Sequence, residues 1–302
     1  MENILYNELC EAIGKDRVKQ EEPMSQHTTF KVGGNAEYFV APDSIEGIKA
    51  VVEVCKKHKV PYYVCGNGSN LLVSDEGFRG VILQIFHNLN ECKMEKGKIT
   101  VQAGMLLTKV AKLISQDGYT GMEFAIGIPG TIGGAVAMNA GAYGGEIKDV
   151  ITKATVLNKE GQVLTLNKEE LELGYRTSII TREEYIVLEA EFELEQGKQE
   201  EIKALCEKNS KARIEKQPLE FPSAGSTFKR PEGYFAGKLI MDAGLRGYTI
   251  GGAQVSEKHC GFIINKGNAK AKDVLDLIQY VQKKVMEEYQ VTLETEVKML
   301  GF

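Results

Sequence analysis

The chain has 302 residues, of which 43% are hydrophobic and 26% charged, and its formal net charge is −5. This length fits two or three packed units of about 100–200 residues, which can bury a core without disulfides or structural metal. The composition excludes a disordered protein. The acidic balance argues against nucleic acid as a partner, because binding phosphates requires a basic face. No run of about 18 apolar residues is present, so we expect no membrane partner.

The N-terminus and the cysteines indicate the compartment. Residues 1–16 mix acidic and basic side chains with apolar ones, unlike a signal peptide, and we expect a short surface helix there. The six cysteines include no C-x-x-C pair and none has a histidine at zinc-ligand spacing. We therefore predict small buried thiols, no metal site and a cytoplasmic protein.

Apolar spacing predicts an α+β protein. In chain order we expect a helix at 45–58, strands at 60–65, 81–86 and 99–101, a helix at 105–116, a hairpin of strands 151–158 and 162–166, and a strand at 185–194. A helix from about Gln196 to Lys216, ended by Pro218, marks the best domain boundary. Beyond it we expect a loop at 218–233, a helix at 236–243, a strand at 261–265, an amphipathic helix at 272–289 and a final strand at 291–300.

Glycine is concentrated in two segments, which implies positive φ angles or close backbone approach. In the first, Gly66–Asn70, backbone N–H groups and the Ser69 and Asn70 side chains can converge on an anion. Its spacing fits neither a dinucleotide fingerprint nor a Walker loop. For this loop alone, a tight hairpin turn around Asn67-Gly68 is the alternative interpretation.

The second segment, 127–145, is long, small and apolar, and no charge lies between Glu123 and Glu146. A loop that faced only water would carry polar residues. The segment is therefore expected to contact a partly apolar group that bears a diphosphate. Two glycine segments in one domain favour a large nucleotide over a single phosphate.

Three motifs together carry a family resemblance: Thr29–Gly34, Gly66–Leu72 and Gly127–Val136. They resemble the FAD-binding domain of the vanillyl-alcohol-oxidase (PCMH) type and, more narrowly, the UDP-N-acetylenolpyruvoylglucosamine reductase (MurB) family. The resemblance covers nearly the whole chain. It implies an N-terminal helical segment at 1–25, an FAD-binding domain of two subdomains at 26–195, split near 90, and a C-terminal α+β substrate-binding domain at 196–302. The last strand of the C-terminal domain could return to the FAD domain.

The resemblance also implies a cofactor and a reaction. FAD would be held noncovalently, since residues 65–72 contain no histidine that could tether it. NADPH would be the reductant and UDP-N-acetylglucosamine enolpyruvate the substrate, reduced in peptidoglycan precursor synthesis by a monomeric enzyme. The expected cofactor-binding residues are Gly66, Asn67, Gly68, Ser69, Asn70, Gly127, Ile128, Pro129, Gly130, Thr131, Gly133, Gly134, Ala135, Asn139 and Gly141.

Three residues match the catalytic positions of the family. Arg176 would stabilise the enolate, because its fork binds a carboxylate bidentately and stays charged. Ser226 would donate the proton, and Glu296 would either polarise the substrate carboxylate or assist protonation. From the residues alone these could be a surface arginine, a turn serine and a solvent-facing glutamate, and strand alternation does not separate Glu296 from Glu294.

A local set of polar and basic residues matches the substrate positions of the family: Tyr175, Arg213, Lys216, Lys229 and His259. Arg213 and Lys216 would share a helix face. The chain leaves no room after Arg176 for the tyrosine-bearing loop of some members, which indicates the shorter subtype. Two other functions stay open: an FAD-dependent oxidase of an alcohol or sugar, and a UDP-sugar-binding module without catalysis.

Overall fold

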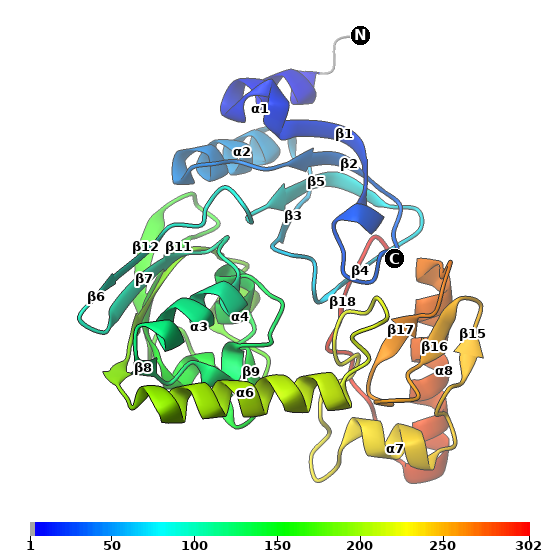
Figure 1. The fold of residues 1–302 in the computed structure, drawn as a ribbon. Helices are drawn as coiled ribbons and strands as arrows, with labels where there is room; N and C mark the ends of the chain where they lie inside the picture. Colours follow the sequence, from blue (N-terminus) through cyan, green and yellow to red (C-terminus); the bar gives the residue numbers. More distant parts are fainter. Residues whose placement is uncertain (1–3) are drawn as a thin grey trace. The chain divides into compact units, whose positions relative to one another are not determined.

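The computed structural model describes residues 4–302, and their contacts divide the chain into two units. The first unit comprises the chain up to Gln20, Tyr38–Asn67 and Gly80–Arg213; the second comprises Glu21–Glu37, Gly68–Arg79 and Ile214–Phe302. The chain order of the elements can be followed in Figure 1. No helix of the described residues is long and apolar enough to cross a membrane.

The first unit mixes helices with short strands. In chain order its elements are α1 (Ile4–Ile13), β1 (Val18–Pro23), β2 (Asn35–Val40), α2 (Ile45–His58), β3 (Tyr62–Cys65), β5 (Phe78–Gln84), β6 (Cys92–Glu95), β7 (Lys98–Gln102), α3 (Leu107–Gln116), β8 (Tyr119–Thr120), α4 (Ile132–Ala137), β9 (Gly141–Ala142), β10 (Gly145–Glu146), β11 (Ile151–Leu157), β12 (Val163–Asn167), α5 (Ile179–Arg182), β13 (Ile186–Glu193), β14 (Glu195–Gln196) and α6 (Gln199–Lys216). Strands β1, β2 and β5 and helix α6 also carry the chain into the second unit.

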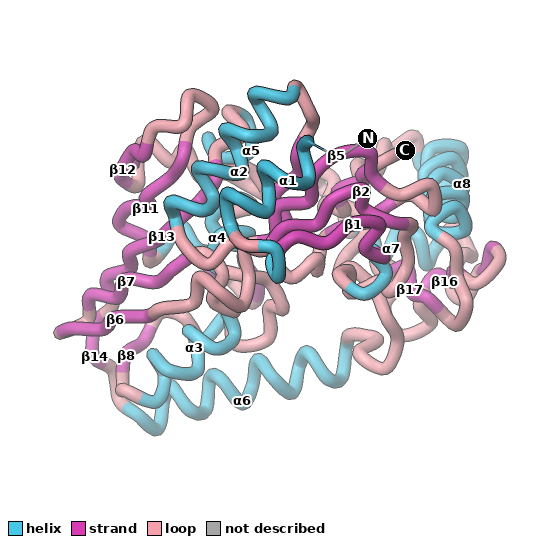
Figure 2. Tube along the Cα trace, turned by 90° about the horizontal axis from the view of Figure 1, so that it is seen from above, coloured by secondary structure: helices cyan, strands magenta, loops and turns pink. Residues whose placement is uncertain are grey.

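Two sheets organise the first unit. One has the order β12-β11-β13-β7-β6 and is antiparallel throughout; its strands lie side by side in Figure 2. The other has the order β1-β2-β5-β3, and β3 pairs with β5 in parallel. The predicted hairpin at 151–166 is confirmed, because β11 and β12 pair antiparallel.

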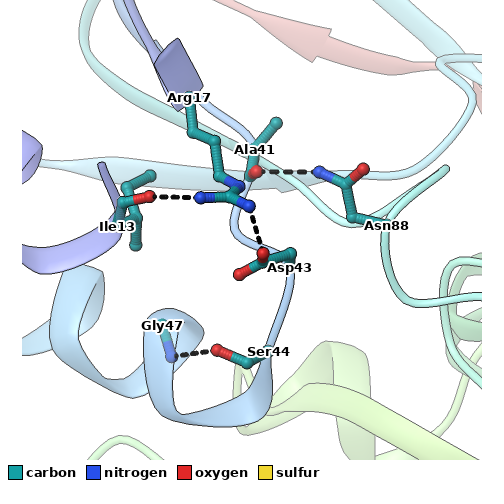
Figure 3. Close-up of polar contacts among 7 residues, drawn as sticks. All are labelled: Ile13, Arg17, Ala41, Asp43, Ser44, Gly47 and Asn88. Carbon is teal, nitrogen blue, oxygen red and sulfur yellow. Dashed lines mark hydrogen bonds and ion pairs between the residues drawn. The ribbon is translucent and has the colours of Figure 1, made fainter. Parts of the chain in front are cut away.

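Helix α2 matches its prediction at both ends, because the local signals are complete. The Ser44 hydroxyl accepts a hydrogen bond from the Gly47 N–H at 3.1 Å, which caps the first turn. Its apolar stripe, including Ile48, Val51 and Cys55, is fully buried. Figure 3 shows this cap beside Arg17, which donates to the Ile13 carbonyl and pairs with Asp43.

The second unit is built on one long helix. Its elements are β4 (Leu71–Val73), α7 (Ala236–Asp242), β15 (Thr249–Ile250), β16 (Ala253–Val255), β17 (Ile263–Asn265), α8 (Ala271–Tyr289) and β18 (Lys298–Leu300). The apolar face of α8, which includes Val274, Leu277 and Val281, is buried and shares one core cluster with residues of the sheet β15-β16-β17. The carboxylate of Asp75 accepts hydrogen bonds from the Ala271 and Lys272 N–H groups at 2.8 and 2.9 Å, which fixes where α8 begins.

Two predictions of secondary structure are wrong in part. The expected strand at 291–300 is regular only at Lys298–Leu300, which pairs in parallel with β4. The preceding residues form a single bridge, between Phe228 and Thr295. The glycine-rich segment 127–145, expected as loop, contains helix α4. Of the cysteines, Cys55, Cys65 and Cys260 are buried as predicted and the other three are half-buried.

Candidate active-site residues

The two glycine segments meet inside the first unit. A Cβ placed on Gly66 would lie 2.4 Å from the Thr131 Oγ1, so only glycine fits there. The side-chain amide of Asn67 donates to the Pro129 carbonyl at 2.6 Å. Because β3 pairs with β5 and β4 pairs with β18, the strands on either side of Gly66–Asn70 do not form a hairpin. The hairpin interpretation of this loop is therefore wrong.

The contact of the two segments leaves backbone donors available. Thr131 caps α4, since its Oγ1 accepts a hydrogen bond from the Gly134 N–H at 3.4 Å. Within the described part of the first unit, the N–H groups of Gly66, Asn67, Gly130 and Thr131 donate to no other residue. Backbone N–H groups without a protein acceptor, beside a glycine too crowded for a Cβ, fit the diphosphate of a nucleotide cofactor.

The remainder of the first glycine loop belongs to the second unit. Gly68 has φ +61°, and a Cβ there would lie 2.0 Å from the His27 carbonyl oxygen. Asn70 is bound to the C-terminal segment: its side-chain amide donates to the Glu296 carbonyl at 3.1 Å, and its own carbonyl accepts from the Lys298 N–H at 3.0 Å. The expected cofactor loop is thus joined to the backbone of an expected catalytic residue.

Arg176 occupies a tight turn of the first unit. Gly174 and Thr177 form an antiparallel bridge, and Arg176 between them has φ +55°. Its guanidinium donates to the Gly141 carbonyl at 3.2 Å and lies 5.3 Å from the centre of the Tyr175 ring. Tyr175 is 54% exposed. A half-buried guanidinium beside an exposed aromatic side chain suits an anionic, partly planar ligand.

Asn139 has a different environment from the one expected of a cofactor ligand. Its residue is fully buried. Its amide nitrogen donates to the Glu146 carboxylate at 2.7 Å and to the Gly174 carbonyl at 3.0 Å, and its oxygen accepts from the Lys148 N–H at 2.9 Å. All the strong hydrogen bonds of this side chain are therefore made within the protein.

Arg213 lies against the second glycine segment. Its Cδ would be 2.6 Å from a Cβ on Gly127. Burial lowers the pKa of the Arg213 guanidinium, and the neighbouring Tyr143 phenol opposes this shift. No described carboxylate forms a salt bridge with Arg213. A partly desolvated cation of this kind favours an anionic ligand. Tyr143 was not predicted as a site residue, because its only signal in the sequence is its position between glycines.

Ser226 and Glu296 lie on paired segments of the second unit. The Glu296 N–H donates to the Thr227 carbonyl at 2.8 Å. Thr227 is fully buried, and its hydroxyl accepts from the Ile263 N–H at 3.0 Å. Ser226 is exposed and follows Gly225, which has φ +77°. Thr227 thus anchors the serine loop and the glutamate segment to the same sheet, a role that nothing in the sequence indicated.

Lys229 has an acidic partner within the second unit. Its ammonium contacts the Glu294 carboxylate at 2.9 Å, and this hydrogen bond lowers the pKa of Glu294. The two acids that strand alternation could not separate therefore differ: Glu294 is paired with a lysine at the surface, whereas Glu296 is half-buried. Lys216, the last residue of α6, is exposed.

His259 is held as a neutral ring. Its Nδ1 accepts the Gly261 N–H at 3.1 Å, and the ring packs edge-on against Phe262 at 5.0 Å between centroids. Burial lowers the pKa of His259. The bonded tautomer therefore carries its proton on Nε2, which can donate to a ligand acceptor.

Comparison with known proteins identifies both parts of the chain. Residues 36–167 match the model of an FAD binding domain, and residues 217–300 match that of the UDP-N-acetylenolpyruvoylglucosamine reductase C-terminal domain. The expected α+β architecture, an FAD-binding domain followed by a second domain, is confirmed. An alkyldihydroxyacetonephosphate synthase, 19% identical with a TM-score of 0.51 over 65% of this chain and 41% of its own, shares the fold alone.

Relatives that match this chain over nearly its whole length share one name. The UDP-N-acetylenolpyruvoylglucosamine reductase of Lachnoclostridium phytofermentans is 56% identical over 100% of this chain and 98% of its own length, and that of Alkaliphilus metalliredigens is 52% identical over 98% of both. The crystal structure of UDP-N-acetylenolpyruvylglucosamine reductase (MurB) from Thermus caldophilus matches with a TM-score of 0.80 at 35% identity, over 94% of this chain and 98% of that one. The chain belongs to the UDP-N-acetylenolpyruvoylglucosamine reductase family.

Proposed function

We propose that the chain reduces UDP-N-acetylglucosamine enolpyruvate to UDP-N-acetylmuramate, a step of peptidoglycan precursor synthesis, with FAD as cofactor and NADPH as reductant. The observation that carries this proposal is the 56% identity to a reductase of that name over the whole chain. The FAD binding domain at 36–167 supports the cofactor. The same comparisons argue against an oxidase and against a UDP-sugar-binding module without catalysis.

The glycine segments provide the expected cofactor contacts. We infer that the N–H groups of Gly66, Asn67, Gly130 and Thr131 bind the diphosphate, since they have no acceptor among the described residues of the first unit. FAD held by these groups would supply the hydride transfer from NADPH to the enolpyruvyl double bond. Asn139, which the sequence suggested as a ligand, makes its side-chain bonds within the protein instead.

Arg176 is the residue we assign to the developing charge. Reduction of the double bond leaves negative charge on the carbon next to the carboxylate. A guanidinium that holds this carboxylate through two hydrogen bonds stabilises that charge as it forms. The turn at 174–177 supports the assignment, because it fixes the arginine backbone in one conformation.

Ser226 is the residue we assign to protonation of the same carbon, with Glu296 assisting. A serine hydroxyl is a weak acid, so it needs a neighbouring charge or a relay to another acid. The hydrogen bond between the Glu296 N–H and the Thr227 carbonyl supports this, since it connects the backbones of the two segments.

The anionic substrate requires basic and polar contacts. We assign them to Tyr175, Arg213, Lys216, Lys229 and His259, and the partly desolvated Arg213 with its neighbour Tyr143 supports a phosphate contact most directly. On substrate binding, the Lys229 ammonium would leave the Glu294 carboxylate and contact an anionic group of the substrate. We also propose a cytoplasmic location and a monomeric state.

A direct test is steady-state turnover of the purified holoenzyme. We expect a yellow protein that oxidises NADPH only when the enolpyruvyl substrate is added, with UDP-N-acetylmuramate formed in equal amount. NADPH oxidation that depends on oxygen, or on a sugar alcohol, would contradict the proposal and favour the oxidase.

A further inference from the structure

We propose that Asn139 is a positioning residue for Arg176, acting through the backbone of the turn at 174–177. This inference rests on the proposed function, because it concerns the arginine that we assign to the developing charge. It follows from a set of contacts between the end of α4 and this turn, all within the first unit.

The segment from the last residue of α4 to Gly141 holds the arginine turn and the residue after it at three points. The Ser178 hydroxyl donates to the Ala137 carbonyl at 2.7 Å. The Asn139 amide donates to the Gly174 carbonyl at 3.0 Å. The guanidinium of Arg176 itself donates to the Gly141 carbonyl at 3.2 Å. Residues 137, 139 and 141 thus contact the residue that follows the turn, the first residue of the turn and the Arg176 side chain, respectively.

The turn needs this support because its conformation is unfavourable. Arg176 has φ +55°, in the left-handed region that a residue with a Cβ rarely adopts. Such a conformation persists only where the surrounding structure enforces it, and it is found often at functional sites. Freed from its contacts, the turn would relax and the guanidinium would lose its fixed position.

Asn139 is the contact best suited to enforce the turn. It is fully buried, and its amide orientation is unambiguous, since the oxygen faces the Lys148 N–H donor while the nitrogen faces two acceptors. Its own φ of +43° is tolerated better by asparagine than by most residues. An aspartate of the same shape would place a second carboxylate against Glu146 and could not donate to Gly174.

The expected consequence separates two half-reactions. FAD reduction by NADPH does not require stabilisation of the substrate enolate, whereas reoxidation by the enolpyruvyl substrate does. Displacement of the guanidinium by a fraction of an ångström or more should therefore slow only the second half-reaction, on the order of 10- to 100-fold.

The experiment measures both half-reactions of holoenzyme variants by anaerobic stopped-flow. We expect Asn139→Ala to retain FAD, to be reduced by NADPH at the wild-type rate, and to be reoxidised on the order of 10- to 100-fold more slowly, with the loss in kcat rather than KM. Asn158→Ala is the matched control. That asparagine is also buried and bonds Gln162 across a turn, but it lies in the β11–β12 hairpin. It should change neither half-reaction.

A double-mutant cycle distinguishes positioning from a general structural role. In an Arg176→Ala background, Asn139→Ala should slow reoxidation by less than about 2-fold, because its effect requires the arginine. An equal slowing in both backgrounds would overturn the proposal, as would a wild-type reoxidation rate in the single variant. Loss of FAD or slowed reduction by NADPH would instead make Asn139 part of the cofactor site.

Two further measurements cover a variant that does not fold and a wild-type enzyme that is not reoxidised. If Asn139→Ala does not fold, Ser178→Ala removes another of the three contacts and should slow reoxidation in the same selective way; unchanged reoxidation there overturns the proposal. If the wild-type holoenzyme itself is not reoxidised by the enolpyruvyl substrate, the proposed function fails rather than this inference.

Discussion

The side-chain amide of Asn70 donates a hydrogen bond to the backbone carbonyl of Glu296 at 3.1 Å. The bond joins residues that lie 226 positions apart. It connects the glycine loop that is expected to bind the cofactor with the segment that carries an expected catalytic acid. Both residues belong to the second unit. Asn70 therefore has a structural partner that a cofactor role alone would not explain.

This bond predicts the behaviour of Asn70→Ala. The substitution leaves the Glu296 carbonyl without its donor and should lower the free energy of unfolding by about 1 kcal/mol. It should also slow reoxidation by the enolpyruvyl substrate, because the Glu296 backbone loses a hydrogen bond that holds it in place. Chemical denaturation and stopped-flow reoxidation measure the two effects.

The matched control for Asn70 is Asn88→Ala. Asn88 makes the same kind of bond, from its amide to the Ala41 carbonyl at 3.0 Å, in the region drawn in Figure 3. This variant should keep the wild-type reoxidation rate. Equal rates in both variants would show that Asn70 does not act on Glu296.

Gly66→Ala tests the contact between the glycine segments. The new Cβ would lie 2.4 Å from the Thr131 Oγ1, so we expect loss of FAD and a destabilisation of about 1–3 kcal/mol. Gly47→Ala adds the same methyl group in α2, outside both glycine segments, where the new Cβ would lie 3.2 Å from the Ile13 Cγ2, and it should retain the cofactor. The ratio of flavin to protein absorbance checks both, and a fully loaded Gly66→Ala protein would contradict the geometry.

Arg176→Lys tests the need for a planar, bidentate cation. Lysine keeps the charge but loses the fork, so reoxidation by the enolpyruvyl substrate should fall roughly 10²–10³-fold while reduction by NADPH is retained. Rapid-mixing measurements of each half-reaction provide the check. A variant that is reoxidised at the wild-type rate would show that the developing charge is stabilised elsewhere.

His259 predicts a dependence of stability on pH. Because burial lowers its pKa in the folded state, the unfolded chain binds the proton first as pH falls. The contribution of His259 to stability is therefore present above its unfolded pKa of about 6.5 and is lost as pH falls through the lower folded value. Unfolding free energies of His259→Gln should vary less with pH in this window than those of the wild type. Parallel pH profiles would contradict the burial of a neutral ring.

Regular elements with complete local signals were predictable from the sequence. Helix α2 was placed correctly because its apolar stripe and its Ser44 cap are both local. Helix α4 was missed because glycine disfavours helices, and what stabilises it is tertiary: the Gly133 N–H donates to the Ala103 carbonyl at 2.8 Å, and close packing there requires small residues.

The motifs of the candidate site could be predicted from the sequence, but the contacts between them could not. The glycine segments could be located by composition, but the hydrogen bond between Asn67 and Pro129 joins residues 62 positions apart and depends on how the chain between them folds. The strand expected at 291–300 is regular only at 298–300, because alternation does not reveal how many partner residues are available. Before residue 298, the described pairing is with residues 227–229. The roles of Thr227 and Asn139 depend on the same long-range contacts.

Anaerobic stopped-flow of the holoenzyme tests the central claim most directly. NADPH should bleach the flavin of the wild type and of Ser226→Ala alike, and UDP-N-acetylglucosamine enolpyruvate should then restore the colour and yield UDP-N-acetylmuramate in the wild type, while Ser226→Ala completes no turnover. A reduced wild-type enzyme whose colour returns only with oxygen, and never with the enolpyruvyl substrate, would contradict the account.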